Sequence, residues 1–228
     1  MLGWQVLALV ADRMGAVVFP VTPAQAWQTL VQGNQRFVED RSERPHQDLD
    51  HRVLTARGQR PFALVFGCMD SRVAAELIFD RGIGDLAVVR TAGHVVDGGV
   101  LGSVEFGVAV LEIPLVVVLG HDRCGAIGAA LRAHGDGRMP GGYLREIVEK
   151  VTASMVTANR PGQALGDLDP DLLTEEHVRH TVHLIAERSA VVASGVADGS
   201  CAVVGAGYRL EQGQVRLLDV VGEVGVTA

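Results

Sequence analysis

Two short segments of this chain carry side chains that can hold a metal ion. The segment GCMDSR contributes Cys68, Asp70 and Arg72, and the segment GHDRCG contributes His121 and Cys124. Two thiols, an imidazole and a carboxylate oxygen form a ligand set that is typical of zinc. His121 and Cys124 lie three positions apart, as two ligands on one helical turn would. The two segments form one site only if the fold brings them together.

The elements around these segments predict such a fold. The apolar runs FALVFGC, DLAVVRTAG, PLVVVLGH and SCAVVGAGYRL are typical of strands that are buried on both faces of a parallel sheet. Helical patterns separate them at residues 73–80, 100–111, 127–133 and about 174–194. This alternation predicts an α/β fold in which a mostly parallel β-sheet is flanked by helices. Because ligands bind beyond the carboxyl ends of such strands, we expect GCMDSR and GHDRCG to meet there.

The rest of the chain predicts elements at both ends of this sheet. VTPAQAWQTLVQGNQRFVED predicts an N-terminal helical arm, with Thr22 as its cap and Pro23 at its first position. Residues 41–59 indicate a loop with a short helix, and residues 207–222 indicate a C-terminal antiparallel hairpin. The first twenty residues have an apolar stretch too short to span a bilayer, and no basic leader, so we interpret them as a helix or arm.

Composition limits the partners and the compartment. The 228 residues carry a net charge of −7 and no basic cluster, which argues against nucleic acid as a partner. No segment is long and apolar enough for a membrane span. The three cysteines, Cys68, Cys124 and Cys201, are a poor disulfide framework and favour a reducing compartment, the cytoplasm. Cys201 lies inside a predicted strand with no neighbouring motif, so we interpret it as structural.

Each candidate also has an ordinary structural interpretation. Cys68 alone is compatible with a core thiol, and Asp70 or Ser71 with a helix cap. GHDRCGAIG could be a phosphate-binding turn, although its glycine spacing does not match G-x-G-x-x-G.

Three further histidines, His177, His180 and His183, lie three apart on a predicted helix. No thiol or carboxylate completes a second metal site there, so a solvated or interface face is the favoured interpretation.

Taken together, the motifs resemble a known family. CMDSR and HDRC resemble the signature of the β-class carbonic anhydrases. GNQRF, VVRTAG and GSVEFGVAVLEIPLVVVLGH are also similar to that family, and the likeness covers roughly residues 22–222. The resemblance implies one domain over residues 22–228, preceded by an N-terminal extension over residues 1–21. It also implies Zn²⁺ as the cofactor.

The resemblance implies roles for the five residues of the two segments. Cys68, His121 and Cys124 would be the fixed zinc ligands. Asp70 would be the fourth ligand in a closed form. In an open form Asp70 would pair with Arg72, and water would take the fourth position, which a catalytic zinc site keeps open.

Substrate contacts follow from the same resemblance. Gln59, nine residues before Cys68, would hold a substrate oxygen, and Gly125 would offer its backbone amide to bicarbonate. Ala87 stands where the family often has an aromatic residue in the CO2 pocket, so the pocket wall would come from another residue or a partner subunit. His94, after the second predicted strand, is a hypothetical proton relay.

The implied function is the reversible hydration of CO2 to bicarbonate and a proton by a zinc-bound hydroxide. Asp70 and Arg72 would gate the zinc site and orient the hydroxide. Three alternatives remain open at this point: the same zinc centre acting on CS2 or COS, a catalytically silent zinc-binding relative, and a thiol redox protein. The last would use Cys68 and Cys124, which do not form a C-x-x-C motif. The implied assembly is a homodimer or a dimer of dimers.

Overall fold

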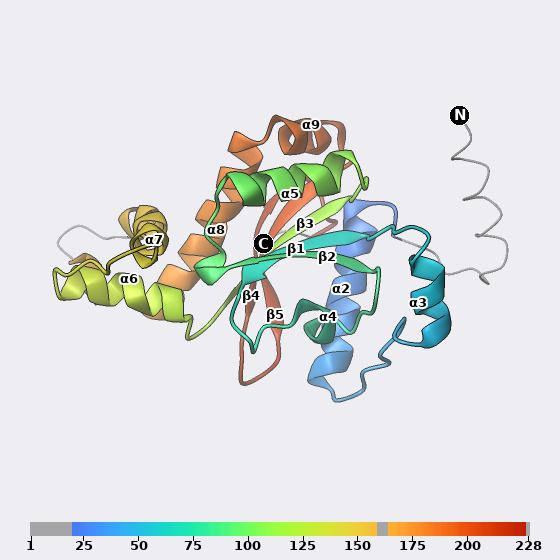
Figure 1. The fold of residues 1–228 in the computed structure, drawn as a ribbon, viewed down its shortest axis with the longest axis horizontal. Helices are drawn as coiled ribbons and strands as arrows, with labels where there is room; N and C mark the ends of the chain where they lie inside the picture. The colour runs from blue at the N-terminus through green and yellow to red at the C-terminus, as the bar shows by residue number, and fades with distance from the viewer. Residues whose placement is uncertain (1–19, 159–163, 227–228) are drawn as a thin grey trace.

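The computed structural model describes residues 20–158 and 164–226, and one five-stranded sheet lies at its centre (Figure 1). The strand order is β2-β1-β3-β4-β5. The strands are β1 (Ala63–Cys68), β2 (Leu86–Thr91), β3 (Leu115–His121), β4 (Ala202–Tyr208) and β5 (Val215–Val221). The first four pair in parallel, and β5 runs antiparallel to β4. The predicted α/β fold and its C-terminal hairpin are therefore confirmed, whereas residues 1–19 of the predicted N-terminal extension lie outside the described residues.

Helices cover both faces of this sheet (Figure 1). Helices α2 and α4 pack on one face, and α5, α8 and α9 pack on the other. Successive side chains of a strand point to opposite faces, so Val65 enters the first core and Phe66 the second. The helices are α2 (Pro23–Val38), α3 (Leu49–Thr55), α4 (Ala75–Ile78), α5 (Gly98–Ala109), α6 (Gly125–Gly135), α7 (Leu144–Ala158), α8 (Pro170–Arg188) and α9 (Ala190–Asp198), with 3₁₀ turns η1 (Ala92–His94) and η2 (Leu165–Asp167).

The single helix expected over residues 174–194 is wrong, because the chain forms two helices that meet at Ser189. Ser189 leaves the helical region, with φ of −101° and ψ of 109°. Its amide bonds the Ile185 carbonyl and ends α8, while its hydroxyl accepts from the Val192 amide and begins α9. A serine side chain that accepts a hydrogen bond from a backbone amide stabilises the start of a helix. The chain can therefore end one helix at such a residue and begin another.

Two other helical expectations also differ from the structure. The helix expected over residues 73–80 is only the four-residue α4. Helix α7 is not among the predicted helices, although its buried positions Val148, Val151 and Met155 recur at helical spacing.

The N-terminal helix begins as predicted, since the Thr22 hydroxyl accepts from the Gln25 amide and Pro23 is the first helical residue. The GNQRF motif then anchors α2. The Asn34 amide donates to the Ile78 and Gly213 carbonyls at 3.2 and 2.8 Å, and its oxygen accepts from the Val215 amide at 2.8 Å. This motif therefore ties α2 to α4 and to the hairpin that joins β4 and β5.

The strand pairing decides where the candidate site forms. Strands β1 and β3 are parallel neighbours, so their final residues, Cys68 and His121, lie at the same edge of the sheet. On the other side of β1, Cys68 is level with Thr91, the last residue of β2, and η1 follows directly. The expectation that GCMDSR and GHDRCG meet at one edge is confirmed.

Candidate metal centre

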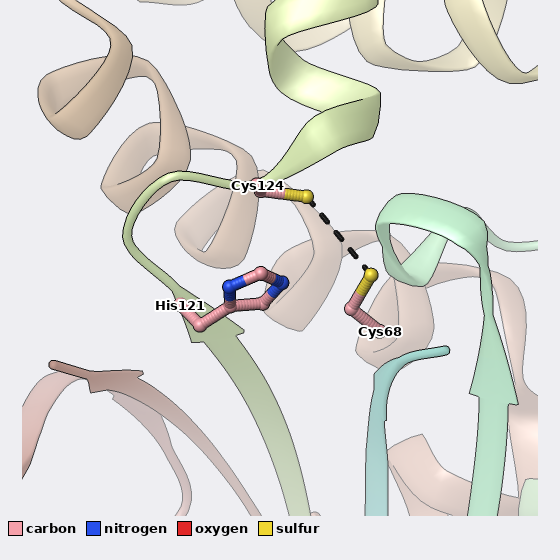
Figure 2. Close-up of side chains that lie close together, drawn as sticks. All are labelled: Cys68, His121 and Cys124. Carbon is pink, nitrogen blue, oxygen red and sulfur yellow. Dashed lines mark hydrogen bonds between the residues drawn. The ribbon is translucent and has the colours of Figure 1, made fainter. Parts of the chain in front are cut away.

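Cys68, His121 and Cys124 converge at the carboxyl edge of the sheet (Figure 2). Cys68 ends β1, His121 ends β3, and Cys124 is the N-cap residue of α6. Their candidate ligand atoms all lie within 4.8 Å of one another, and the two sulfur atoms are 4.0 Å apart. All three residues are buried. In the described part of the chain, no other group of three or more histidine, cysteine and acidic residues has such geometry.

The tautomer of His121 suits a metal ligand. Its Nδ1 lies 2.8 Å from the Asp122 carbonyl oxygen, which can only accept, so Nδ1 carries the hydrogen. Nε2 is then left with its lone pair, and it is buried without a hydrogen-bond partner among the described residues. A hydrogen bond on one ring nitrogen commonly orients the other toward a metal. A buried, unpartnered nitrogen beside two thiols fits a zinc ion.

The two thiols lie within hydrogen-bond distance of each other, and either sulfur can be the donor. This contact, the nearby His121 imidazole and the Gly93 amide at 3.3 Å lower the pKa of the Cys68 thiol against the opposing effect of burial. The same contact, together with burial and the charge of Cys68, raises the pKa of the Cys124 thiol. Metal ligation needs both sulfurs as thiolates, so Cys124 must lose its proton to bind zinc.

Asp70 lies at the edge of this group and is held by Arg72. The Arg72 guanidinium donates to Oδ1 at 2.9 Å and to Oδ2 at 2.7 Å, and the Arg72 amide donates to Oδ1 at 3.0 Å. These bonds hold the pKa of the Asp70 carboxyl well below its usual range. Its Oδ2 remains 3.9 Å from Nε2 of His121. This pairing is the one that the resemblance implies for an open form.

Arg90 is a residue at this site to which the sequence reasoning assigns no role. From β2 its side chain donates to the backbone carbonyls of Cys68, at 2.9 Å, and Asp70. It therefore holds the turn that carries a candidate ligand and the candidate gate. The available signal was a charged residue inside VVRTAG, at the end of an apolar run.

Of the two expected substrate contacts, the structure places one at the metal centre and the other far from it. Gly125 is the first residue of α6, next to Cys124, and a Cβ there would meet no atom within 4 Å. Gln59 is exposed and precedes β1, so it lies at the amino end of the strand whose carboxyl end holds Cys68. The strand alone separates these ends by roughly 16 Å. Gly125 therefore lies at the site of its own chain and Gln59 does not.

Burial argues against the expectation for His94. It is 1% exposed, and neither ring nitrogen has a partner in the described residues. Burial lowers its pKa well below the ordinary value, so it has neither the charge nor the solvent access of a proton relay.

The solvated or interface face expected for the α8 histidines is wrong for His177, which is buried within this chain against Gly93 and Ser154. His183 is exposed and pairs with Asp219. Cys201 is buried outside the metal-ligand group, as a structural role implies.

Ala87 lines an open groove beside β2. The groove has a volume of about 430 Å³, and its walls come from β2 and α5, with Val89, Phe106 and Leu111 among the lining residues. No helix in the described part of the chain is long and apolar enough to cross a membrane.

The fold and the site define an α/β protein whose Cys2His zinc-type centre lies at the carboxyl edge of a parallel sheet. A family model described as carbonic anhydrase matches residues 63–215. Over 203 residues the chain is 50% identical to carbonic anhydrase 2 of Mycobacterium tuberculosis (strain CDC 1551 / Oshkosh), covering 89% of this chain and 96% of that protein. The chain therefore belongs to the β-class carbonic anhydrases, zinc enzymes that hydrate CO2.

Solved structures agree with this assignment. A Coccomyxa β-carbonic anhydrase in complex with acetazolamide matches with a TM-score of 0.67 and 26% identity, covering 85% of this chain and 87% of that chain. One of two tetrameric β-carbonic anhydrases from Sordaria macrospora matches with a TM-score of 0.65 and 22% identity, covering 84% of this chain and 96% of that chain. The second likeness supports the fold alone.

Proposed function

We propose that this chain catalyses the reversible hydration of CO2 to bicarbonate and a proton, with Cys68, His121 and Cys124 as the zinc ligands. The observation that carries the proposal is the convergence of their ligand atoms within 4.8 Å in a chain of this family. When bound, zinc lowers the pKa of a coordinated water to about 7 and so supplies a hydroxide nucleophile. The residues of the chain then hold, orient and gate the reaction.

Asp70 and Arg72 form the proposed gate. Arg72 holds both carboxylate oxygens, so Asp70 stays off the ligand group and would leave a ligand position of a bound zinc free. In this state its carboxylate would accept a hydrogen bond from the nucleophile and orient it toward CO2. If Asp70 turned away from Arg72, its Oδ2, which lies 3.9 Å from His121 Nε2, would be near enough to join the ligand group and close the site.

Gly125 is the proposed contact for bicarbonate. The first amides of a helix have no partner within the helix, and the helix dipole is positive at this end. The amide of Gly125 therefore suits an anion formed beside Cys124. The absence of a side chain leaves room for the anion to approach this backbone.

We further infer that two copies of the chain pair along the β2 edge of the sheet. β2 is an edge strand. Phe106 of α5, which lines the groove beside β2, is 54% exposed, and Val110 just after α5 is 60% exposed. A two-fold axis perpendicular to β2 at that edge would make the two β2 strands antiparallel, and so set the amino end of one sheet beside the carboxyl end of the other. The partner subunit's Gln59 then faces this site, and the partner also supplies the pocket wall that Ala87 lacks.

The cytoplasm is the proposed compartment. All three cysteines are free thiols, and two of them are the proposed ligands. Thiols persist in a reducing compartment.

Stopped-flow CO2 hydration by the zinc-loaded protein, from about pH 7 to about pH 9, tests the proposal. We expect turnover that rises with pH. A zinc-loaded protein without CO2 turnover would contradict the proposed reaction, and assays with CS2 and COS would then separate a changed substrate from a silent relative.

The ligand set is tested separately. Cys124→Ser should lose zinc, whereas the matched control Cys201→Ser should retain it. Thiols that react freely while zinc is bound would favour the redox alternative instead.

A further inference from the structure

Behind the metal centre, a buried chain of hydrogen bonds connects two distant helices to Cys68. His177 on α8 is 2% exposed. Its Nε2 lies 2.9 Å from the Gly93 carbonyl oxygen, and its Nδ1 lies 2.7 Å from the Ser154 hydroxyl of α7. The Gly93 amide in turn donates to Sγ of Cys68 at 3.3 Å. None of these links is part of the carbonic anhydrase mechanism described above.

The chemistry of the partners fixes the direction of each bond. A carbonyl only accepts, so Nε2 of His177 carries a hydrogen and donates to Gly93. Burial lowers the pKa of His177 to about 4, so the ring is neutral and Nδ1 accepts from Ser154. The amide and the carbonyl of Gly93 belong to different peptide groups. His177 therefore acts by fixing the position of Gly93 and not by polarising its amide.

Gly93 lies in a turn that needs such anchoring. Its φ is +64°, in the left-handed region, and the turn η1 has no side-chain cap. A Cβ on Gly93 would come within 2.7 Å of the Ala126 Cβ, so only glycine fits between the turn and α6. Lys150 of α7 holds the next part of the loop by donating to the Val96 carbonyl at 2.5 Å. The position of the Gly93 amide thus depends on contacts from α7 and α8.

We propose that His177 is a positioning residue of the metal centre, which anchors the Gly93 carbonyl and thereby keeps the Gly93 amide on the Cys68 sulfur. This inference rests on the proposed function, because it assumes that Cys68 binds zinc. A hydrogen bond to a thiolate ligand holds the sulfur in place and orients its lone pairs toward the metal. Partners of this kind commonly change metal affinity or activity by about 10–100-fold.

The test compares four variants by zinc affinity, from competition with a chelator, and by the thiolate-to-metal absorption of the cobalt-substituted protein. His177→Leu keeps the volume but removes the donor, and should weaken zinc binding by about 10–100-fold and shift the absorption. His177→Gln keeps an N–H donor at a similar reach and should recover most of the loss. Ser154→Ala should give a smaller change in the same direction. His183→Leu, on the same helix, should behave as the wild type.

Wild-type zinc affinity and an unchanged cobalt spectrum in His177→Leu would overturn the inference, and so would equal losses in the Leu and Gln variants. If His177→Leu does not fold, Ser154→Ala decides, because wild-type behaviour of that variant would also overturn it. A wild-type protein that does not bind zinc overturns the proposed function together with this inference. Zinc binding that is equal in the wild type and the variants overturns the inference alone.

Discussion

Zinc affinity should rise with pH, because the ligand group must release protons to bind the metal. The sulfur atoms of Cys68 and Cys124 are 4.0 Å apart, within hydrogen-bond distance of each other. The pKa of Cys68 is lowered and that of Cys124 is raised, so near neutral pH the first is a thiolate and the second a thiol. A protonated ligand competes with the metal, and affinity therefore falls as pH falls.

The expected size follows from the number of protons. Release of the one proton on Cys124 changes the zinc affinity about tenfold per pH unit. His121 adds a second proton at lower pH. Burial opposes its charged form, but the nearby Cys68 thiolate, the Asp122 carbonyl and the Asp70 carboxylate together outweigh burial and raise its pKa above the ordinary value of 6.5. Below pH 6.5 the dependence should therefore steepen to about a hundredfold per pH unit.

Competition with a chelator at a series of pH values measures this dependence. Titration calorimetry in two buffers of different ionisation enthalpy counts the released protons directly. The control is Cys201→Ser, since Cys201 is not in the ligand group and burial raises its pKa to about 12. A zinc affinity that is flat between about pH 7 and 9 would refute the reasoning that Cys124 carries a proton in this range.

Four further outcomes are expected. Asp70→Asn should keep zinc, because the three ligands remain, but lower CO2 hydration by about 100-fold or more; full activity would remove Asp70 from the mechanism. Asn34→Ala breaks two buried hydrogen bonds and one partly buried one, and should lower the free energy of unfolding in urea by about 3 kcal/mol; a loss below about 1 kcal/mol would contradict that anchor. Phe106→Asp should yield monomers in sedimentation, whereas an unchanged assembly would argue against pairing at β2. His94→Leu should leave the ratio of turnover in weak and strong buffer unchanged, and a loss rescued by strong buffer would restore His94 as a relay.

The fold and the three ligands could be predicted because their signals are local. A strand buried on both faces of a sheet appears as an uninterrupted apolar run, and β1 and β3 both have this pattern. Parallel pairing then places the residues after each run at one edge, which unites Cys68 with His121 and Cys124. The break at Ser189 escaped prediction because apolar positions continue across it, and only its hydrogen bonds distinguish a cap from a helix interior.

Proximity in sequence was a poor guide for the remaining site residues. Gln59 is close to Cys68 along the chain, but a strand carries them to opposite ends of the sheet. His177 and Ser154 come from helices far along the chain and reach the metal centre through Gly93. No local pattern marks them, because a buried histidine and an exposed one look alike in sequence. Residue types and spacing thus determined the sheet and the metal ligands, whereas only the packing of helices and strands decided which side chains support those ligands.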